Sequence, residues 1–241
     1  MMWNENILQK IKWNEEITNR EQKEATVKQI ALKVKDGDVI GFGSGSTSFL
    51  AIHTIAKKIK AENLNVLAIP TSYEVELLCQ NLGIPTTTLN KHKPNWGFDG
   101  ADEVYVDKYP NGENRYWLIK GRGGALFREK LIMAASEITY ILVDDTKLVN
   151  NLGEKFPIPV EVIPEALHFV KESLLKMNIG IISMDLRLAK GKDGPIITEY
   201  GNFILDVKFS EIKQGTEHVI KNIPGVLESG LFIGYNIEVL K

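Results

Sequence analysis

Residues 38–47, with the sequence DVIGFGSGST, decide the fold because they pass from an apolar run through a glycine and serine loop into a helical pattern. Residues 38–42 predict a short buried strand, and residues 43–46 predict a tight loop. Residues 47–60 predict a helix with one apolar face. At such a turn from strand to helix, free amides and the helix dipole favour an anion, and phosphate is the natural candidate.

The spacing of this loop argues against two common nucleotide motifs. No lysine precedes Ser or Thr as in a Walker A loop, and Ser46 stands where G-x-G-x-x-G has its third glycine. No acidic residue ends the next predicted strand to hold a ribose hydroxyl, so dinucleotide binding is disfavoured. The alternative to anion binding is a glycine turn whose Ser and Thr side chains serve only as helix caps.

Strands and helices alternate on both sides of this stretch. A helix is predicted over residues 20–35, and another is expected to start near Ser72, with Thr71 and Glu74 as a capping box, and to stop at Gly83. Further strands are predicted over residues 65–69, 84–89, 98–102, 116–119 and 140–143, and a further helix over residues 125–136. This alternation indicates βαβ units, and therefore an α/β fold with a doubly wound, mostly parallel, Rossmann-like sheet.

The pattern changes after Asn150, where prolines and glycines punctuate shorter elements. A second, smaller α+β domain of the ferredoxin-like kind is predicted from helices over residues 165–177 and 210–220 and an antiparallel pair of strands over residues 181–189 and 196–206. The predicted organisation is an N-terminal extension at residues 1–19, the Rossmann-like domain at residues 20–152 plus 225–241, and the small domain at residues 153–224.

Composition restricts the class of partner. The 241 residues include 29 basic and 31 acidic side chains, and the formal charge of −2 predicts no attraction to nucleic acid or to an anionic membrane. No stretch approaches the roughly 20 apolar residues that span a bilayer. One cysteine and four scattered histidines predict neither a disulfide nor a metal site, and they favour a cytoplasmic location. A small-molecule partner is left by elimination.

Two further stretches carry candidate functional groups. Residues 98–103, FDGADE, place Asp99 and Asp102 at the end of an apolar run, which is the edge where open α/β sheets bind ligands. Residues 118–130, LIKGRGGALFREK, bring Lys120, a glycine loop and Glu129 to one edge. The alternatives are an ordinary acidic turn for the first stretch, and solvated cations with a surface ion pair for the second.

Together these stretches resemble the ribose-5-phosphate isomerases of the A type. The resemblance rests on GFGSGST, IPTSYEVELLCQNLGIP, FDGADEV, LIKGRGGALFREK, KFPIPVEVIP, GNFILDV and IPGVLESGLF, in the family's order and spacing over about residues 20–235. It implies interconversion of D-ribose 5-phosphate and D-ribulose 5-phosphate without metal or organic cofactor, in a homodimer or homotetramer. The alternatives are a catalytically silent sugar-phosphate sensor and another sugar-phosphate isomerase of the same fold.

The resemblance also implies a role for each matching position. Glu129 resembles the general base that shuttles a proton between C2 and C1 through an enediolate. Asp99 and Asp102 match the acidic pair that assists ring opening, and Lys120 matches the lysine that, with the glycine amides after it, steadies the developing oxyanion. The positions implied to bind substrate are Ser44, Gly45, Ser46, Thr47, Asp99, Gly100, Ala101, Asp102, Lys120, Gly121, Arg122, Gly123, Lys147 and Lys23.

The chain departs from the family pattern in two places. Arg122 stands where glycine is more common, and its guanidinium is expected to reach the site, a partner chain or solvent. The second departure is the N-terminal extension together with a short ending after Gly230. It is expected to alter the edge strands and the oligomer contact more than the catalytic residues. A sensor is expected to add a helix-turn-helix, whereas residues 1–40 show one good amphipathic helix.

Overall fold

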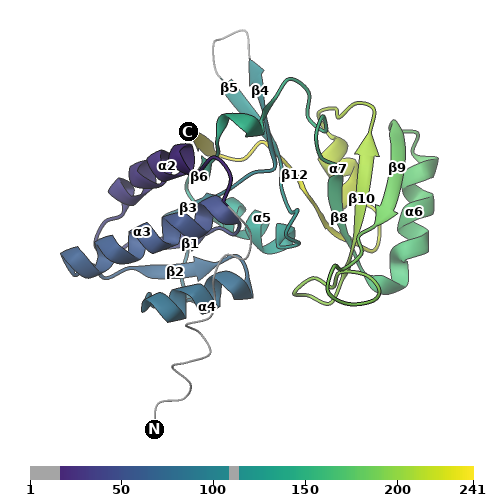
Figure 1. Cartoon of the computed structure of the whole chain (residues 1–241). Helices are drawn as coiled ribbons and strands as arrows, with labels where there is room; N and C mark the ends of the chain where they lie inside the picture. Colours follow the sequence, from purple (N-terminus) through teal and green to yellow (C-terminus); the bar gives the residue numbers. More distant parts are fainter. Residues whose placement is uncertain (1–16, 109–113) are drawn as a thin grey trace. The chain divides into compact units, whose positions relative to one another are not determined.

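The computed structural model describes residues 17–108 and 114–241, which gather into two compact units (Figure 1). The first unit takes in residues 17–100, 128–145 and 236–241. The second takes in the described residues of 101–127 and 146–235. Residues 1–16 of the predicted N-terminal extension lie outside the described part of the chain.

Parallel strands form the sheet of the first unit. In spatial order they are β2 (Leu67–Pro70), β1 (Val39–Phe42), β3 (Trp96–Asp99), β6 (Thr139–Leu142) and β13 (Ile237–Leu240). The order reverses between β1 and β3, and open α/β sheets bind ligands outside the carboxyl ends of the strands at such a reversal. The predicted doubly wound, mostly parallel sheet is confirmed.

The helices of the first unit follow the strands as the sequence predicts. They are α2 (Arg20–Lys33), α3 (Ser46–Glu62), α4 (Tyr73–Leu82) and α5 (Leu126–Ala135), of which α5 begins in the second unit. The connection through α3 runs from β1 to β2, and the connection through α4 runs back from β2 to β3. Since parallel crossovers are right-handed, these two helices cover opposite faces of the sheet.

The start of α4 corrects one detail of the sequence analysis. The N-cap residue is Ser72, whose Oγ accepts a hydrogen bond from the Val75 amide at 3.2 Å. The predicted capping box of Thr71 and Glu74 is wrong, because Thr71 precedes the N-cap, its amide donates to Phe42 O at 3.0 Å, and its buried hydroxyl has no hydrogen-bond partner among the described residues. Gly83 ends the helix with φ 75, as predicted.

The core of the first unit holds the ends of β1 and β3 together. Phe42 and Phe98 are fully buried, and their ring centroids lie 5.0 Å apart. Burial, with a smaller contribution from Glu76, raises the pKa of the Cys79 thiol to about 12, so this cysteine behaves as a core residue. The loops that follow β1 and β3 therefore start from fixed points.

Two sheets make up the second unit. One has the order β12 (Leu231–Ile233), β5 (Asn114–Ile119), β4 (Glu103–Lys108), β7 (Leu148–Val149). The other is antiparallel, with the order β11 (Val226–Ser229), β8 (Ile158–Val162), β10 (Phe203–Phe209), β9 (Ile181–Leu186). With helices α6 (Leu167–Lys176) and α7 (Thr216–Lys221), the chain order β8-α6-β9-β10-α7-β11 is the β-α-β-β-α-β arrangement of ferredoxin-like folds. The predicted small α+β part is confirmed.

Several predicted bounds differ from the structure. Residues 84–89 form no strand and contribute a single bridge between Ala68 and Thr86. The strand predicted over residues 196–206 is β10, which begins only at Phe203, because Gly201 at φ 77 turns the chain before it. The helix predicted over residues 210–220 is α7, which begins at Thr216 after Gly215 adopts φ 94.

The compact units divide the chain at other positions than the predicted domain boundaries. The described residues of 101–127, together with residues 146–152 and 225–235, gather with the second unit, although the sequence analysis assigns them to the Rossmann-like domain. Compactness is only one criterion for a domain, so the predicted boundaries stay a prediction.

The described residues contain neither a membrane-spanning helix nor a cluster of metal-ligating side chains. None of the helices in residues 17–108 and 114–241 is long and apolar enough to cross a membrane. Within the same residues, no three His, Cys, Asp or Glu side chains are grouped so that they could hold a metal ion.

Candidate active site

The loop after β1 lies at the carboxyl end of the strand next to the sheet reversal. The amide of Gly43 donates to Phe98 O at 2.8 Å, which joins the loop to β3. Gly45 adopts φ 88 and precedes the first residue of α3, Ser46, while Thr47 is buried in the first turn. Positive φ favours glycine at position 45, and the helix start turns free amides toward the end of the strands. The predicted strand, glycine loop and helix are thus observed.

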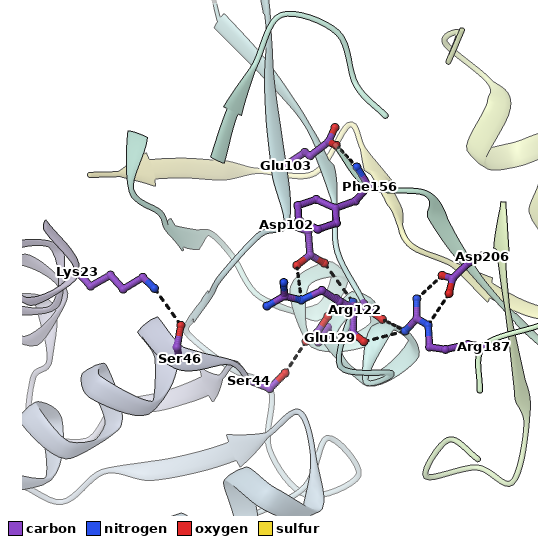
Figure 2. Close-up of polar contacts among 11 residues, drawn as sticks. Lys23, Ser44, Ser46, Asp102, Glu103, Arg122, Glu129, Phe156, Arg187 and Asp206 are labelled. Carbon is purple, nitrogen blue, oxygen red and sulfur yellow. Dashed lines mark hydrogen bonds and ion pairs between the residues drawn. The ribbon is translucent and has the colours of Figure 1, made fainter. Parts of the chain in front are cut away.

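Ser44 joins two buried carboxylates. Its Oγ donates to Glu129 Oε1 at 2.6 Å (Figure 2), and its amide donates to Asp99 Oδ1 at 3.2 Å. Asp99 Oδ1 also accepts from the Gly100 amide at 2.8 Å. Asp99 ends β3 and Glu129 lies in the first turn of α5. Three elements that are distant in the sequence therefore bring a hydroxyl and two carboxylates to one place.

Gly43 is required where β1 and β3 come close. A Cβ built on Gly43 would overlap the carboxyl group and the Cα of Asp99, and backbone atoms cannot yield as a flexible side chain does. We expect Gly43→Ala to destabilise the fold by about 1–3 kcal/mol. We also expect kcat to fall by about 10-fold or more, because Asp99 and Ser44 move together. Thermal unfolding and steady-state kinetics measure the two effects.

The matched control for this substitution is Gly191→Ala. A Cβ on Gly191 meets no atom within 4 Å, and its φ lies outside the left-handed region. The control is expected to match the wild type in thermal midpoint and kcat. A Gly43→Ala protein with wild-type values for both quantities would contradict the steric argument.

Lys23 reaches the same loop from α2. Lys23 is buried, and its ammonium group donates to Ser46 Oγ at 3.2 Å, a contact drawn in Figure 2. The same group lies 3.9 Å from Asp144 Oδ2. The sequence analysis did not single out Asp144 as a site residue. It follows the end of β6 as Asp99 ends β3, so its position after a parallel strand was the available signal.

The second unit holds the other predicted residues. Lys120 follows β5 and is buried; its amide donates to Gly230 O at 2.9 Å, and its Nζ lies 5.7 Å from the centroid of the Phe232 ring. Gly121 adopts φ 92, and Gly123 is exposed. Lys147 ends the short 3-10 helix η1 (Asp145–Lys147).

Arg122, the departure from the family pattern, contacts Asp102. Its amide donates to Asp102 Oδ2 at 3.1 Å, and its Nε lies 3.7 Å from Asp102 Oδ1 (Figure 2). The guanidinium carbon lies 5.6 Å from the centroid of the Phe156 ring, and Lys147 Nζ lies 5.8 Å from the same centroid. The Arg122 side chain is 64% exposed, so these contacts leave most of it in solvent.

Glu103 is a second residue that sequence reasoning missed. Its carboxylate is fully buried and accepts from the amides of Gly153, Lys155 and Phe156 at 2.7, 2.6 and 2.7 Å. The Lys155 ammonium group in turn donates to the carbonyls on either side of Lys147, at 2.6 and 3.3 Å. Glu103 therefore fixes the backbone of residues 153–156, which includes Phe156. Through Lys155, the same segment also holds the backbone on either side of Lys147. Its place at the end of FDGADE was the only signal.

The predicted site residues thus form two sets. In the first unit, Ser44 binds both Asp99 and Glu129, and Lys23 binds Ser46 of the same loop. In the second unit, Arg122 contacts Asp102, and Arg122 and Lys147 both contact the Phe156 ring. The first set surrounds the carboxyl ends of β1 and β3. Open α/β enzymes place their ligand-binding and catalytic residues at this edge, and the chain is of that class.

The chain belongs to the ribose 5-phosphate isomerase A (phosphoriboisomerase A) family, whose model matches residues 67–240. The ribose-5-phosphate isomerase A of Methanocaldococcus jannaschii is 43% identical over 218 residues, which cover 90% of this chain and 92% of that protein. That of a Synechococcus strain is 43% identical over 222 residues, covering 90% and 91%. The chain is accordingly an enzyme with ribose-5-phosphate isomerase A activity.

Solved structures support the same assignment. The structure of the M. jannaschii enzyme has a TM-score of 0.83 at 41% identity, and the match covers 93% of this chain and 96% of that one. A D-ribose-5-phosphate isomerase in complex with phospho-erythronic acid has a TM-score of 0.82 at 38% identity, with 91% and 94% covered. The resemblance seen in the sequence motifs is confirmed, and the silent sensor is set aside.

Proposed function

We propose that Glu129 is the general base that interconverts D-ribose 5-phosphate and D-ribulose 5-phosphate through an enediolate. The observation that supports this role is the buried Glu129 carboxylate, held at 2.6 Å by the Ser44 hydroxyl. In the forward direction the carboxylate removes the proton from C2 of the open-chain aldose and returns it to C1. The hydroxyl proton moves from O2 to O1, so atoms and charge balance and no oxidant is needed.

The two aspartates act at the oxygens. Asp99 lies beside Ser44, and its Oδ1 accepts from two backbone amides, which fix the carboxylate at the end of β3. We assign ring opening to Asp99 and Asp102, since opening a furanose needs a proton taken from O1 and one given to O4. A positioned acid or base contributes about 10²–10⁴-fold to such a step.

Lys120 and the amides of Gly121 and Gly123 stabilise the oxyanion of the enediolate, while the amide of Arg122 donates to Asp102 Oδ2 at 3.1 Å. Negative charge develops on oxygen when C2 loses its proton, and fixed donors that meet this charge lower the barrier without having to reorganise. Lys120 is buried and leaves β5 at a glycine with φ 92, so its position is set by the strand. A cation in such a site supplies the electrostatic stabilisation that this chemistry requires.

The phosphate group supplies binding energy away from the reacting carbons. We propose that residues 44–47 and Lys147 bind it, and that Lys23 acts by holding Ser46 in place at 3.2 Å. A relative solved in complex with phospho-erythronic acid supports a phosphate-binding part of the site in general, because that compound combines a phosphate ester with a planar carboxylate. A planar carboxylate resembles the enediolate that the reaction forms.

The decisive experiment is a coupled assay on the purified full chain. Ribose 5-phosphate is supplied with EDTA present, and formation of ribulose 5-phosphate is followed. We expect turnover that is unchanged by EDTA and competitive inhibition by arabinose 5-phosphate, whose inverted C2 presents its proton on the wrong face. Loss of turnover with EDTA, restored by an added divalent cation, would overturn the metal-free mechanism.

Replacing Lys147 by alanine is expected to raise KM by about 10-fold and leave kcat within about twofold, because an anchor for the phosphate contributes equally to ground and transition states. Steady-state kinetics on ribose 5-phosphate measure the split. The matched control is Lys176→Ala, which removes a lysine that is 77% exposed and pairs with Glu172 one turn earlier in α6. A large loss of kcat at unchanged KM would contradict the anchoring role.

We also propose that the protein assembles as a homodimer or homotetramer. The proposal comes from the family resemblance, and sedimentation velocity at the enzyme concentration of the assay tests it. A monomer with full activity would overturn it. The cytoplasmic location likewise stays a prediction from the sequence.

A further inference from the structure

Arg187 is an arginine outside every stretch that the sequence analysis singled out as catalytic. It follows β9 directly, in the antiparallel sheet of the second unit. Its side chain is only 13% exposed, which is unusual for an arginine without a structural partner. The guanidinium must therefore have a specific set of hydrogen bonds.

One edge of this guanidinium is held by Asp206 on β10. Arg187 Nε donates to Asp206 Oδ2 at 2.8 Å, and Nη2 forms a short ion pair with Asp206 Oδ1 (Figure 2). Asp206 pairs with Asp185 in the register of β10 and β9, so its own position is fixed by the sheet. A two-point contact of this kind fixes the orientation of the guanidinium plane.

The other edge holds the glycine loop after Lys120. Arg187 Nη1 donates to the carbonyl of Gly121 at 2.9 Å and to the carbonyl of Arg122 at 2.8 Å. A peptide unit is planar and trans, so fixing a carbonyl also fixes the direction of the N–H in the same plane. The carbonyl of Gly121 shares its plane with the amide of Arg122, and the carbonyl of Arg122 shares its plane with the amide of Gly123.

Both amides have a part in the proposed site. The amide of Arg122 donates to Asp102 Oδ2 at 3.1 Å, and the amide of Gly123 is one of the donors assigned to the oxyanion. Within the loop, the Gly124 amide donates to the Gly121 carbonyl at 3.0 Å, but among the described residues the Arg122 carbonyl accepts no such internal bond. Arg187 binds both carbonyls and so restrains two successive peptide planes.

We propose that Arg187, oriented by Asp206, is a positioning residue for the isomerase reaction. It sets the peptide planes that join residues 121, 122 and 123, so that their amides meet the developing oxyanion and Asp102. The inference rests on the proposed function, since it assumes that this loop acts in the reaction. Arg187 itself does not touch the sugar.

Three variants test the proposal: Arg187→Ala, Arg187→Lys and Asp206→Asn. We expect Arg187→Ala to lower kcat by about 10–100-fold with KM within about twofold, because a misplaced group costs rate more than affinity. Arg187→Lys should recover little, since an ammonium cannot bind one carboxylate and two carbonyls in a plane. Asp206→Asn keeps Arg187 but weakens the two-point contact that orients the guanidinium plane. We therefore expect a smaller loss of kcat than in Arg187→Ala.

Chemical rescue separates positioning from mere folding. Guanidinium ion at a concentration of a few millimolar, far below denaturing levels, is expected to restore part of the kcat of Arg187→Ala and none of the loss in Glu129→Gln. Lys208→Gln is the control, because Lys208 is an exposed cation on the same strand as Asp206.

Several outcomes would overturn the inference. Wild-type kcat in Arg187→Ala, a rise in KM at constant kcat, or a loss of kcat that guanidinium leaves unchanged would each do so. If Arg187→Ala does not fold, an unchanged kcat in folded Asp206→Asn overturns it equally. A wild-type protein without isomerase turnover would instead remove the proposed function, so the two failures are distinguishable.

Discussion

Replacing Glu129 by glutamine is expected to lower kcat by about 10²–10⁴-fold, with KM changed by less than about threefold. The amide oxygen of glutamine still accepts from the Ser44 hydroxyl, which lies 2.6 Å from Oε1 in the native enzyme. The fold and the substrate pose are therefore preserved while the proton acceptor is lost. The coupled assay gives kcat and KM, and substrate deuterated at C2 reports on the proton transfer directly.

The control for this substitution is Glu137→Gln. Glu137 is exposed just beyond the end of α5, so it tests the effect of removing one negative charge from the same segment. It should turn over at the wild-type rate. A Glu129→Gln enzyme with kcat within threefold of wild type would remove Glu129 from the role of base.

Replacing Lys120 by methionine is expected to lower kcat by about 10²–10³-fold, which corresponds to about 2.7–4 kcal/mol of transition-state stabilisation. Methionine is unbranched and similar in length, so it fills the buried space that the lysine stem occupies beside Phe232. The change removes the positive charge and leaves the packing in place. Steady-state kinetics measure kcat, and circular dichroism with thermal unfolding verifies the fold.

Lys108→Met is the matched control, because Lys108 is an exposed lysine at the far end of the neighbouring strand β4. It should leave kcat and KM unchanged. If Lys120→Met raises KM with kcat constant, the lysine binds the ground state and the oxyanion belongs to other donors.

Much of the first unit could be predicted because its signals are local. Apolar periodicity gave most strands and helices between Arg20 and Leu142 to within a few residues, but it missed β4 (Glu103–Lys108) and predicted a strand after Gly83 that does not form. That stretch, residues 84–89, is apolar enough for a strand, yet only Thr86 pairs, with Ala68. A strand forms only where a neighbouring strand offers a row of hydrogen-bonding partners. The local pattern of apolar residues contains no information about that neighbour.

Site residues that stand within a sequence motif were predicted, and those that are brought to the site only by the folding of distant strands were missed. Ser44, Asp99 and Glu129 stand in motifs that resemble the family, and the structure joins them by direct hydrogen bonds. Arg187 and Asp206 belong to a hairpin of the other sheet. Nothing in the spacing of residues 187 and 206 relates them to a loop at residues 121–123, because the relation exists only after both sheets have formed.

The sequence by itself determined the order of elements, the glycine loop that follows β1 and the set of chemical groups available for the reaction. These properties depend on neighbours within a few positions, where the period of apolar residues and the backbone freedom of glycine are decisive. Only the tertiary structure decided that Ser44 binds Glu129, that Asp144 lies beside Lys23, and that Arg187 grips the loop after Lys120. Such contacts join residues 66 to 121 positions apart, so they arise from strand order and packing.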